Sequence, residues 1–155
     1  MAIMDAKLEF CDAMVISCAS ASAQISTNVF KMADVYSGWK AQIGSSAAEI
    51  TNDIFRANNG LVANIQVATV FEASATVVCK LLTSAASALV SSGTVLGTAT
   101  TIAAAAAVGT RRQIRVPAGT SVDNWIGMTF SVIGSSMDTG AVDAWLGLDL
   151  DTPST

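Results

Sequence analysis

The strongest constraint on the fold is a strict two-residue alternation near the end of the chain, in residues 141–150. Every second residue there is apolar, namely Val142, Ala144, Leu146, Leu148 and Leu150. The residues between them are Asp143, Trp145, Gly147 and Asp149. Successive side chains of a β-strand point to opposite faces, so this pattern predicts a strand with one face in the core and the other outside.

Further strands are predicted upstream of this one. Residues 111–116 and 125–133 read as strands, because Pro- and Gly-containing turns at 117–120 and 134–140 separate them. Residues 61–71 alternate in the same way, and 76–82 is predicted as their hairpin partner across a turn at 72–75. Weaker strands are predicted at 28–30 and 94–96, and residues 4–16 form either a first strand or an extended arm. The sum is about six to eight strands.

Helix signals are few. Ser46 and Glu49 fit a capping box, and Ala47, Ile50 and Ile54 follow at helical spacing, so a short helix is predicted over 46–55. Five alanines at 103–107 are too few for a stable helix, and we expect a loop there with at most one helical turn. The predicted fold is therefore all-β and mainly antiparallel, a jelly roll or β-sandwich, with a short helix in the N-terminal half.

The chain has 155 residues, the size of one domain, so we expect a single jelly-roll domain over 1–155. Its predicted parts are an N-terminal arm or strand over about 1–20, an inserted loop and helix segment over about 31–59, and a short flexible tail over about 151–155.

Composition argues against several classes of protein. Hydrophobic residues make up 52% of the chain, but the longest uncharged run, residues 81–110, is rich in Ser, Thr and Gly, so no membrane-spanning segment is predicted. Asp5, Glu9 and Asp12 stand where a secretory signal would carry positive charge, which argues for a protein that stays in the cytoplasm after synthesis. The net charge of −4 argues against binding to nucleic acid.

The residues needed for common catalytic and metal sites are missing or scattered. The chain has no histidine, and its three cysteines, Cys11, Cys18 and Cys79, form neither a metal motif nor an even disulfide set. We read the cysteines as reduced apolar residues. The acidic residues show no calcium-loop pattern, and nucleotide-binding motifs are absent. We therefore expect no catalytic residues, no cofactor, no metal site and no enzymatic activity.

The candidate interface residues are Arg111, Arg112, Arg115, Trp39 and Trp145. By strand parity Arg111 and Arg115 share one face and Arg112 takes the other. The arginines could bind an acidic partner, or they could be solvated and pair with Asp123 or Asp143 of the same chain, which is the commoner role of exposed charge. The tryptophans could stack on sugars or fill a partner's pocket, although packing within a two-layer fold is at least as common.

Only 13% of the residues are charged, against roughly a quarter in an average domain. A surface so poor in charge is either covered by partners or simply a neutral surface rich in Ser and Thr. Composition does not distinguish these two readings.

Several segments together resemble a known family. They are STNV at 26–29, KLLTS at 80–84, GTVL at 93–96, GTR at 109–111, RVPAGT at 115–120 and GAVDAWL at 140–146. In this order, over about two thirds of the chain, they resemble the capsid cement (decoration) proteins of tailed bacteriophages, of the jelly-roll type found on podovirus-like heads.

The resemblance implies a structural virion protein on the outer surface of the assembled icosahedral head, which bridges neighbouring major capsid subunits and stabilises the shell. It also implies a symmetric homo-oligomer, a dimer or a trimer. Residues 31–59 are longer than the corresponding connection in that family, so the oligomer contact stays open. The alternative, based on the tryptophans, is a carbohydrate-binding jelly-roll module of a phage tail or bacterial surface protein.

Overall fold

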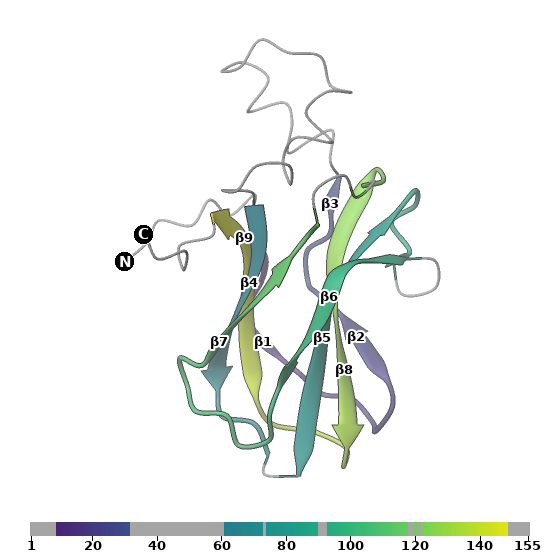
Figure 1. Ribbon diagram of the computed structural model, residues 1–155. Coiled ribbons are helices and arrows are strands. Elements are labelled where there is room, and N and C mark those ends of the chain that lie inside the picture. The colour runs from purple at the N-terminus through teal and green to yellow at the C-terminus, as the bar shows by residue number, and fades with distance from the viewer. Residues whose placement is uncertain are drawn as a thin grey trace.

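The computed structural model describes residues 9–31, 61–72, 74–89, 93–117, 120 and 122–148, and these form two packed β-sheets (Figure 1). The strands are β1 (Glu9–Val15), β2 (Ala23–Ile25), β3 (Phe30–Lys31), β4 (Leu61–Thr69), β5 (Ala75–Ser84), β6 (Thr94–Ile102), β7 (Arg111–Arg115), β8 (Trp125–Gly134) and β9 (Ala141–Leu148). The prediction of an all-β, antiparallel sandwich is confirmed.

The strand order is that of a jelly roll. One sheet has the order β1-β9-β4-β7, and the other has the order β2-β8-β5-β6, with β3 also paired to β8. Because β2 and β3 pair with successive parts of β8, they form one interrupted strand, and each sheet then has four strand positions. Most connections cross between the sheets, which produces the eight-position double-sheet arrangement of a jelly roll.

The predicted hairpin between residues 61–71 and 76–82 is wrong. β4 lies between β9 and β7, whereas β5 lies between β8 and β6 in the other sheet. The connection carries Phe71, which is only 2% exposed, into the space between the sheets. Burial of this large side chain is gained when the chain crosses to the second sheet, and a tight turn beside β4 would forgo it.

Other predictions vary in outcome. β1 confirms a strand within residues 4–16, whereas the short strand β2 was not among the predicted strands. Residues 103–110 form turns without a helix, and Ala105 has a φ of 54°. Trp39, the predicted helix over 46–55 and the tail over 151–155 lie outside the described residues.

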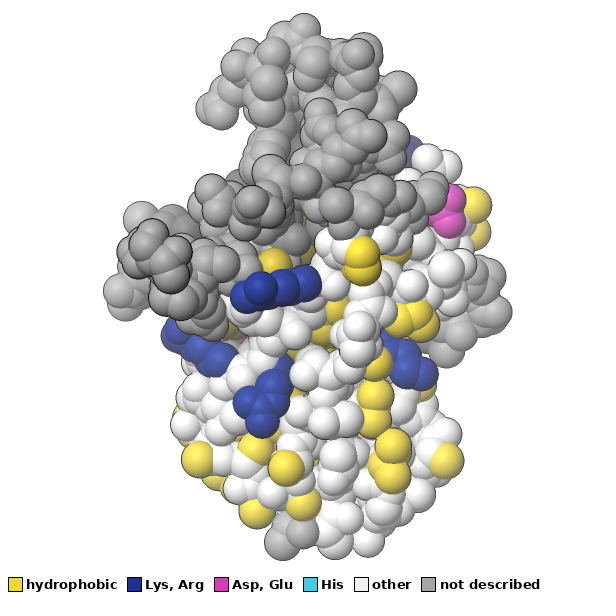
Figure 2. Space-filling model, in the orientation of Figure 1, with side chains coloured by type: hydrophobic (Ala, Val, Ile, Leu, Met, Phe, Trp, Pro, Cys, Tyr) yellow, Lys and Arg dark blue, Asp and Glu magenta, His cyan; other side chains and the backbone are white. Residues whose placement is uncertain are grey.

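Four connections meet at one end of the sandwich, which we call the low-charge end and define as residues 16–22, 70–72, 103–110 and 134–140. Backbone hydrogen bonds join these segments, including Ile16 N to Gly140 O and Gly109 N to Val67 O at the end of β4. Their charged residues are Glu72 and Asp138. Figure 2 shows this lower part of the molecule covered by uncharged and hydrophobic side chains.

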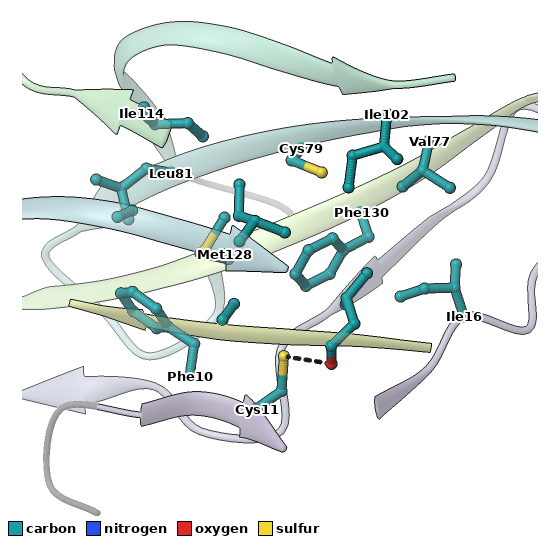
Figure 3. Close-up of a cluster of buried hydrophobic side chains, with 14 of the residues drawn as sticks. Phe10, Cys11, Ile16, Val77, Cys79, Leu81, Ile102, Ile114, Met128 and Phe130 are labelled. Atoms are coloured by element: carbon teal, nitrogen blue, oxygen red, sulfur yellow. Dashed lines mark hydrogen bonds between the residues drawn. The ribbon is translucent and has the colours of Figure 1, made fainter. Parts of the chain in front are cut away.

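The core fills the space between the two sheets (Figure 3). The alternation in β9 is confirmed where side chains are described, because Val142 and Ala144 are fully buried and Leu146 is 4% exposed. β8 contributes Met128 and Phe130, both fully buried. The rings of Phe10 and Phe30 pack at a centroid distance of 4.7 Å. Such alternate burial fixes which side chains each sheet presents outward.

Candidate interface on the outer face of one sheet

The sheet β1-β9-β4-β7 presents a set of polar side chains on its outer surface, which we call the polar face. The core residues Ala63 and Ile65 of β4, Ile114 of β7 and Ala144 of β9 are at most 1% exposed. Their neighbours along each strand therefore point outward. The polar face consists of Arg111, Gln113 and Arg115 from β7, Asn64 and Gln66 from β4, and Asp143, Trp145 and Gly147 from β9. Val62 of β4 points to the same side but is only 4% exposed.

Strand register arranges these residues in three rows across the sheet. The first row is Arg111, Gln66 and Asp143. The second is Gln113, Asn64 and Trp145. The third is Arg115, Val62 and Gly147. Adjacent strands lie about 4.8 Å apart, so residues of one row are neighbours although they are far apart in sequence.

Hydrogen bonds hold the charged groups of the first row in place. Arg111 Nε donates to Gln66 Oε1 at 2.8 Å. Asp143 Oδ1 accepts a hydrogen bond from Ala13 N of β1 at 2.7 Å, where Ala13 has a φ of 41° within an irregular part of that strand. Gln66 thus separates the guanidinium from the carboxylate, and each charge is oriented by a neutral group.

The second row combines amides with an aromatic ring. Gln113 Nε2 donates to Asn64 Oδ1 at 2.9 Å. A Cβ atom at Gly147 would lie 2.9 Å from Asn64 Nδ2 and 3.2 Å from Trp145 Nε1. The indole therefore lies along the strand, over the position where Gly147 has no side chain, and its edge adjoins the Asn64 amide.

Arg112 does not belong to the polar face. Its Nε donates to Thr101 O of β6 at 3.1 Å, and its Nη1 donates to Arg111 O at 2.9 Å. It therefore connects the edges of the two sheets. Within the described part of the chain, Arg111 and Arg112 donate to these neutral oxygens of Gln66, Thr101 and Arg111, and make no ion pair with Asp123 or Asp143.

Charge divides the polar face into two sides. Arg111 and Arg115 lie on the β7 side. Asp143 lies on the β9 side, beyond which β1 adds Glu9, the partner of Trp145 in the register, and the exposed Asp12. Figure 2 shows basic side chains grouped around β7 with no described acidic side chain among them. The face is therefore positive at one edge, neutral over β4 and negative at the other edge.

The outer surface of the other sheet differs, because a segment of the same chain packs on it. Leu89 is fully buried, and its side chain would meet any Cβ placed on Gly127 of β8. Leu82, beside Gly127 in the register, is 6% exposed. This apolar contact covers part of the second sheet, whereas the first sheet presents hydrogen-bonded polar groups.

Of the predicted interface residues, Arg111, Arg115 and Trp145 lie on one face of the sheet. Arg112 lies at the sheet edge, and Trp39 is outside the described residues. The partners Gln66, Asn64 and Gln113 were not predicted as members. The alternation in residues 61–71 marked Asn64 and Gln66 as outward-facing, but the wrong hairpin placed them beside another strand. Only the register of β4 with β7 and β9 shows that these three residues lie beside the predicted ones.

Burial makes two of the cysteines unreactive core residues. It raises the pKa of Cys11 to about 12, although a backbone hydrogen bond from Ala144 opposes this shift. Burial also raises the pKa of Cys79 to about 12. All three cysteines are free, and Cys18 is partly buried. The thiols of Cys11 and Cys79 therefore stay protonated at neutral pH.

No cluster of three or more His, Cys, Asp or Glu side chains occurs within the described ranges. No helix in that part of the chain is long and apolar enough to cross a membrane. Comparison with protein-family models finds no match. Comparison with curated proteins finds no match either.

Proposed function

We propose that this chain is a capsid cement protein of a tailed bacteriophage, a non-enzymatic virion protein on the outer surface of the head. It is made in the bacterial cytoplasm, binds the major capsid protein of the same phage and bridges neighbouring subunits. The observation that carries the proposal is the strand order β1-β9-β4-β7 over β2-β8-β5-β6, because this is the jelly roll that the sequence resemblance implies.

The low-charge end supports the proposal as the surface that contacts the shell. Val70 and Val108 are 46% and 60% exposed there. Glu72 is engaged within this end, because its Oε1 accepts hydrogen bonds from Asp138 N and Thr139 Oγ1, both at 3.3 Å. A surface with few charges can be buried on another protein without the large desolvation cost of unpaired ions.

Stabilisation of the shell follows from linkage. A protein that binds the assembled shell and not its separate subunits lowers the free energy of the assembled state, by about 2.7 kcal/mol per site at a concentration 100 times Kd. A copy that touches two capsid subunits gains from effective concentration, because the first contact holds the second surface close. Repetition around a symmetry axis multiplies these contacts.

The test compares heads of the phage that encodes this chain, purified with and without the protein, by the temperature at which they release DNA in low salt. We expect a higher release temperature with the protein. Val108→Asp should remove this protection, because it places a charge in the low-charge end. Val95→Asp is the matched control, since Val95 is 44% exposed on β6 and away from that end. Equal release temperatures with and without the wild-type protein would contradict the proposal.

One observation favours the rival function of carbohydrate binding. Trp145 lies beside the amides of Asn64 and Gln113, and an aromatic ring next to hydrogen-bonding amides suits a sugar ring. A glycan array probed with the isolated protein distinguishes the two functions. Glycan binding that is lost in Trp145→Ala, together with no affinity for heads, would favour the rival.

A further inference from the structure

We infer that the low-charge end docks on the shell in one orientation, which Arg111 and Arg112 set by pairing with carboxylates of a capsid subunit. The inference rests on the proposed function and adds the chemistry of the partner surface. An apolar surface with a charged border on one side is the anatomy of a specific protein interface, in which burial supplies affinity and the border supplies specificity.

The low-charge end gathers most of the exposed apolar side chains. Five large hydrophobic side chains are exposed in the described part of the chain, and four of them lie in this end or are the strand residue next to it. They are Val15, Val70, Val108 and Ile133, which are between 46% and 60% exposed. Exposed apolar groups gathered at one end mark a surface that is buried on another protein.

The two arginines border this surface on one side. Residues 103–110 of the low-charge end connect β6 to β7, and Arg111 is the first residue of β7. Arg112 reaches back across this connection, because its Nε donates to Thr101 O, one residue before the end of β6. No described acidic side chain lies among the basic ones around β7 (Figure 2). The cationic border is therefore the β6–β7 side of the low-charge end.

Both guanidinium groups keep donors for a partner. Arg111 holds Gln66 Oε1 with Nε at 2.8 Å, and among the described residues its two Nη groups make no hydrogen bond. Arg112 uses Nε and Nη1 on Thr101 O and Arg111 O, so Nη2 has no partner within the same part of the chain. A guanidinium that is already held by such bonds loses less conformational freedom when it pairs with a carboxylate.

The rest of the low-charge end disfavours other orientations. Residues 16–22 join β1 to β2 at the opposite edges of the sheets and carry no charged group. Between the two sides, Glu72 Oε1 accepts a hydrogen bond from Asp138 N, which brings these two acidic residues together. After half a turn the capsid carboxylates would be buried unpaired against 16–22, and after a smaller shift they would meet Glu72 and Asp138. Desolvation disfavours the first arrangement and repulsion disfavours the second.

The first test needs no variant. Heads of the phage that encodes this chain, purified without the protein, are titrated with the isolated full chain, and co-sedimentation measures the bound fraction. We expect the dissociation constant to rise several-fold between about 50 and 500 mM NaCl, because salt screens the pairs at the border. A contact made by the apolar surface alone would not weaken with salt.

Charge removal locates the pairs. Arg111→Gln should weaken binding about threefold, and the addition of Arg112→Gln should bring the loss to about tenfold and flatten the dependence on salt. Lys31→Gln is the matched control, because it removes one positive charge from an exposed residue at the other end of β8, opposite Trp125 in the register. It should bind as the wild type does. Urea denaturation of each variant before the titration shows that it is folded.

A cross-link identifies the partner group. Arg111→Lys keeps the positive charge and supplies a primary amine, which a carbodiimide condenses with an adjacent carboxylate to an amide with loss of water. Mass spectrometry should find the introduced lysine joined to an Asp or Glu of the major capsid protein, and Lys31 joined to none.

The outcomes separate this inference from the proposed function. Wild-type binding that salt does not weaken, together with equal binding by the variant that lacks both arginines, would overturn the inference and leave shell binding intact. Absence of binding at every salt concentration would overturn both.

Discussion

At the scale of single residues, Gly140 shows how one position allows the chain to cross between sheets. Its φ is 113°, and a Cβ there would meet the ring and the backbone of Phe71, whose Cα would be 3.2 Å away. Phe71 carries the connection from β4 to β5 into the core. The absence of a side chain at Gly140 therefore lets Phe71 occupy its place.

Gly140→Ala should lower the free energy of unfolding by about 2–4 kcal/mol, because it combines backbone strain with overpacking. Gly109→Ala is the matched control, since Gly109 has a φ of 85° and nothing within 4 Å of the added atom. It should cost only the backbone strain, about 1–2 kcal/mol. Urea denaturation measures the free energy of unfolding of both variants. Equal losses of stability would show that contact with Phe71 adds nothing to the cost of a side chain at position 140.

The cysteines support a second prediction at this scale. A thiol whose pKa is raised by folding stabilises the protein fully below the unfolded value of 9.0, and that stability is lost as the pH rises from there towards the folded value of about 12. Stability should therefore fall above pH 9, by up to about 1.4 kcal/mol per pH unit for each thiol.

Denaturation between pH 8 and pH 11 measures this fall, and Cys79→Ala, which cannot ionise, should show a shallower one. At pH 8 a thiol reagent should modify the partly buried Cys18 first. Fast modification of Cys79 in the folded protein would contradict its burial.

At the scale of elements, Ser26 holds the interrupted strand made of β2 and β3 against β8. The residue is 2% exposed, and its Oγ donates to Asn28 O at 2.8 Å and accepts from Met128 N at 3.1 Å. Its own N donates to Met128 O at 2.8 Å. The Ser26 side chain thus supplies a hydrogen bond to the backbone of β8 at the point between β2 and β3 where strand pairing is interrupted.

Ser26→Ala should lower the free energy of unfolding by about 1–3 kcal/mol, because it leaves the buried Met128 N without its acceptor. Ser17→Ala is the control, because Ser17 is exposed and its backbone N, which the substitution keeps, makes its hydrogen bond to Gln24 Oε1. Hydrogen exchange at Met128 should quicken in the first variant alone. Unchanged exchange at Met128 would mean that another group replaces the hydroxyl.

Individual strands could be predicted from sequence where one face is buried. The alternation in β9 and β4 marked Val142, Ala144, Ile65 and Val67 as core residues because burial has a period of two. β2 has no such pattern, since its three residues lie at an edge and are partly or fully exposed. Its existence depends on Ser26 and on pairing with β8, which are contacts between distant parts of the chain.

At the scale of the whole molecule, pairing between strands could not be predicted by the same reasoning. Alternation shows which way Asn64 points, but does not show that it lies between Gln113 and Trp145. The jelly-roll prediction was right because strand number and turn composition constrain the class of fold. The polar face was predicted only in part, because its rows join residues more than seventy positions apart, such as Gln66 and Asp143.

The proposed function is the decoration of an assembled capsid. A cryo-electron microscopy density map of the head of the phage that encodes it tests the claim most directly. We predict density for a jelly roll on the outer surface, with its low-charge end on at least two neighbouring capsid subunits. A complete, infectious head whose outer surface carries no such density would contradict the claim.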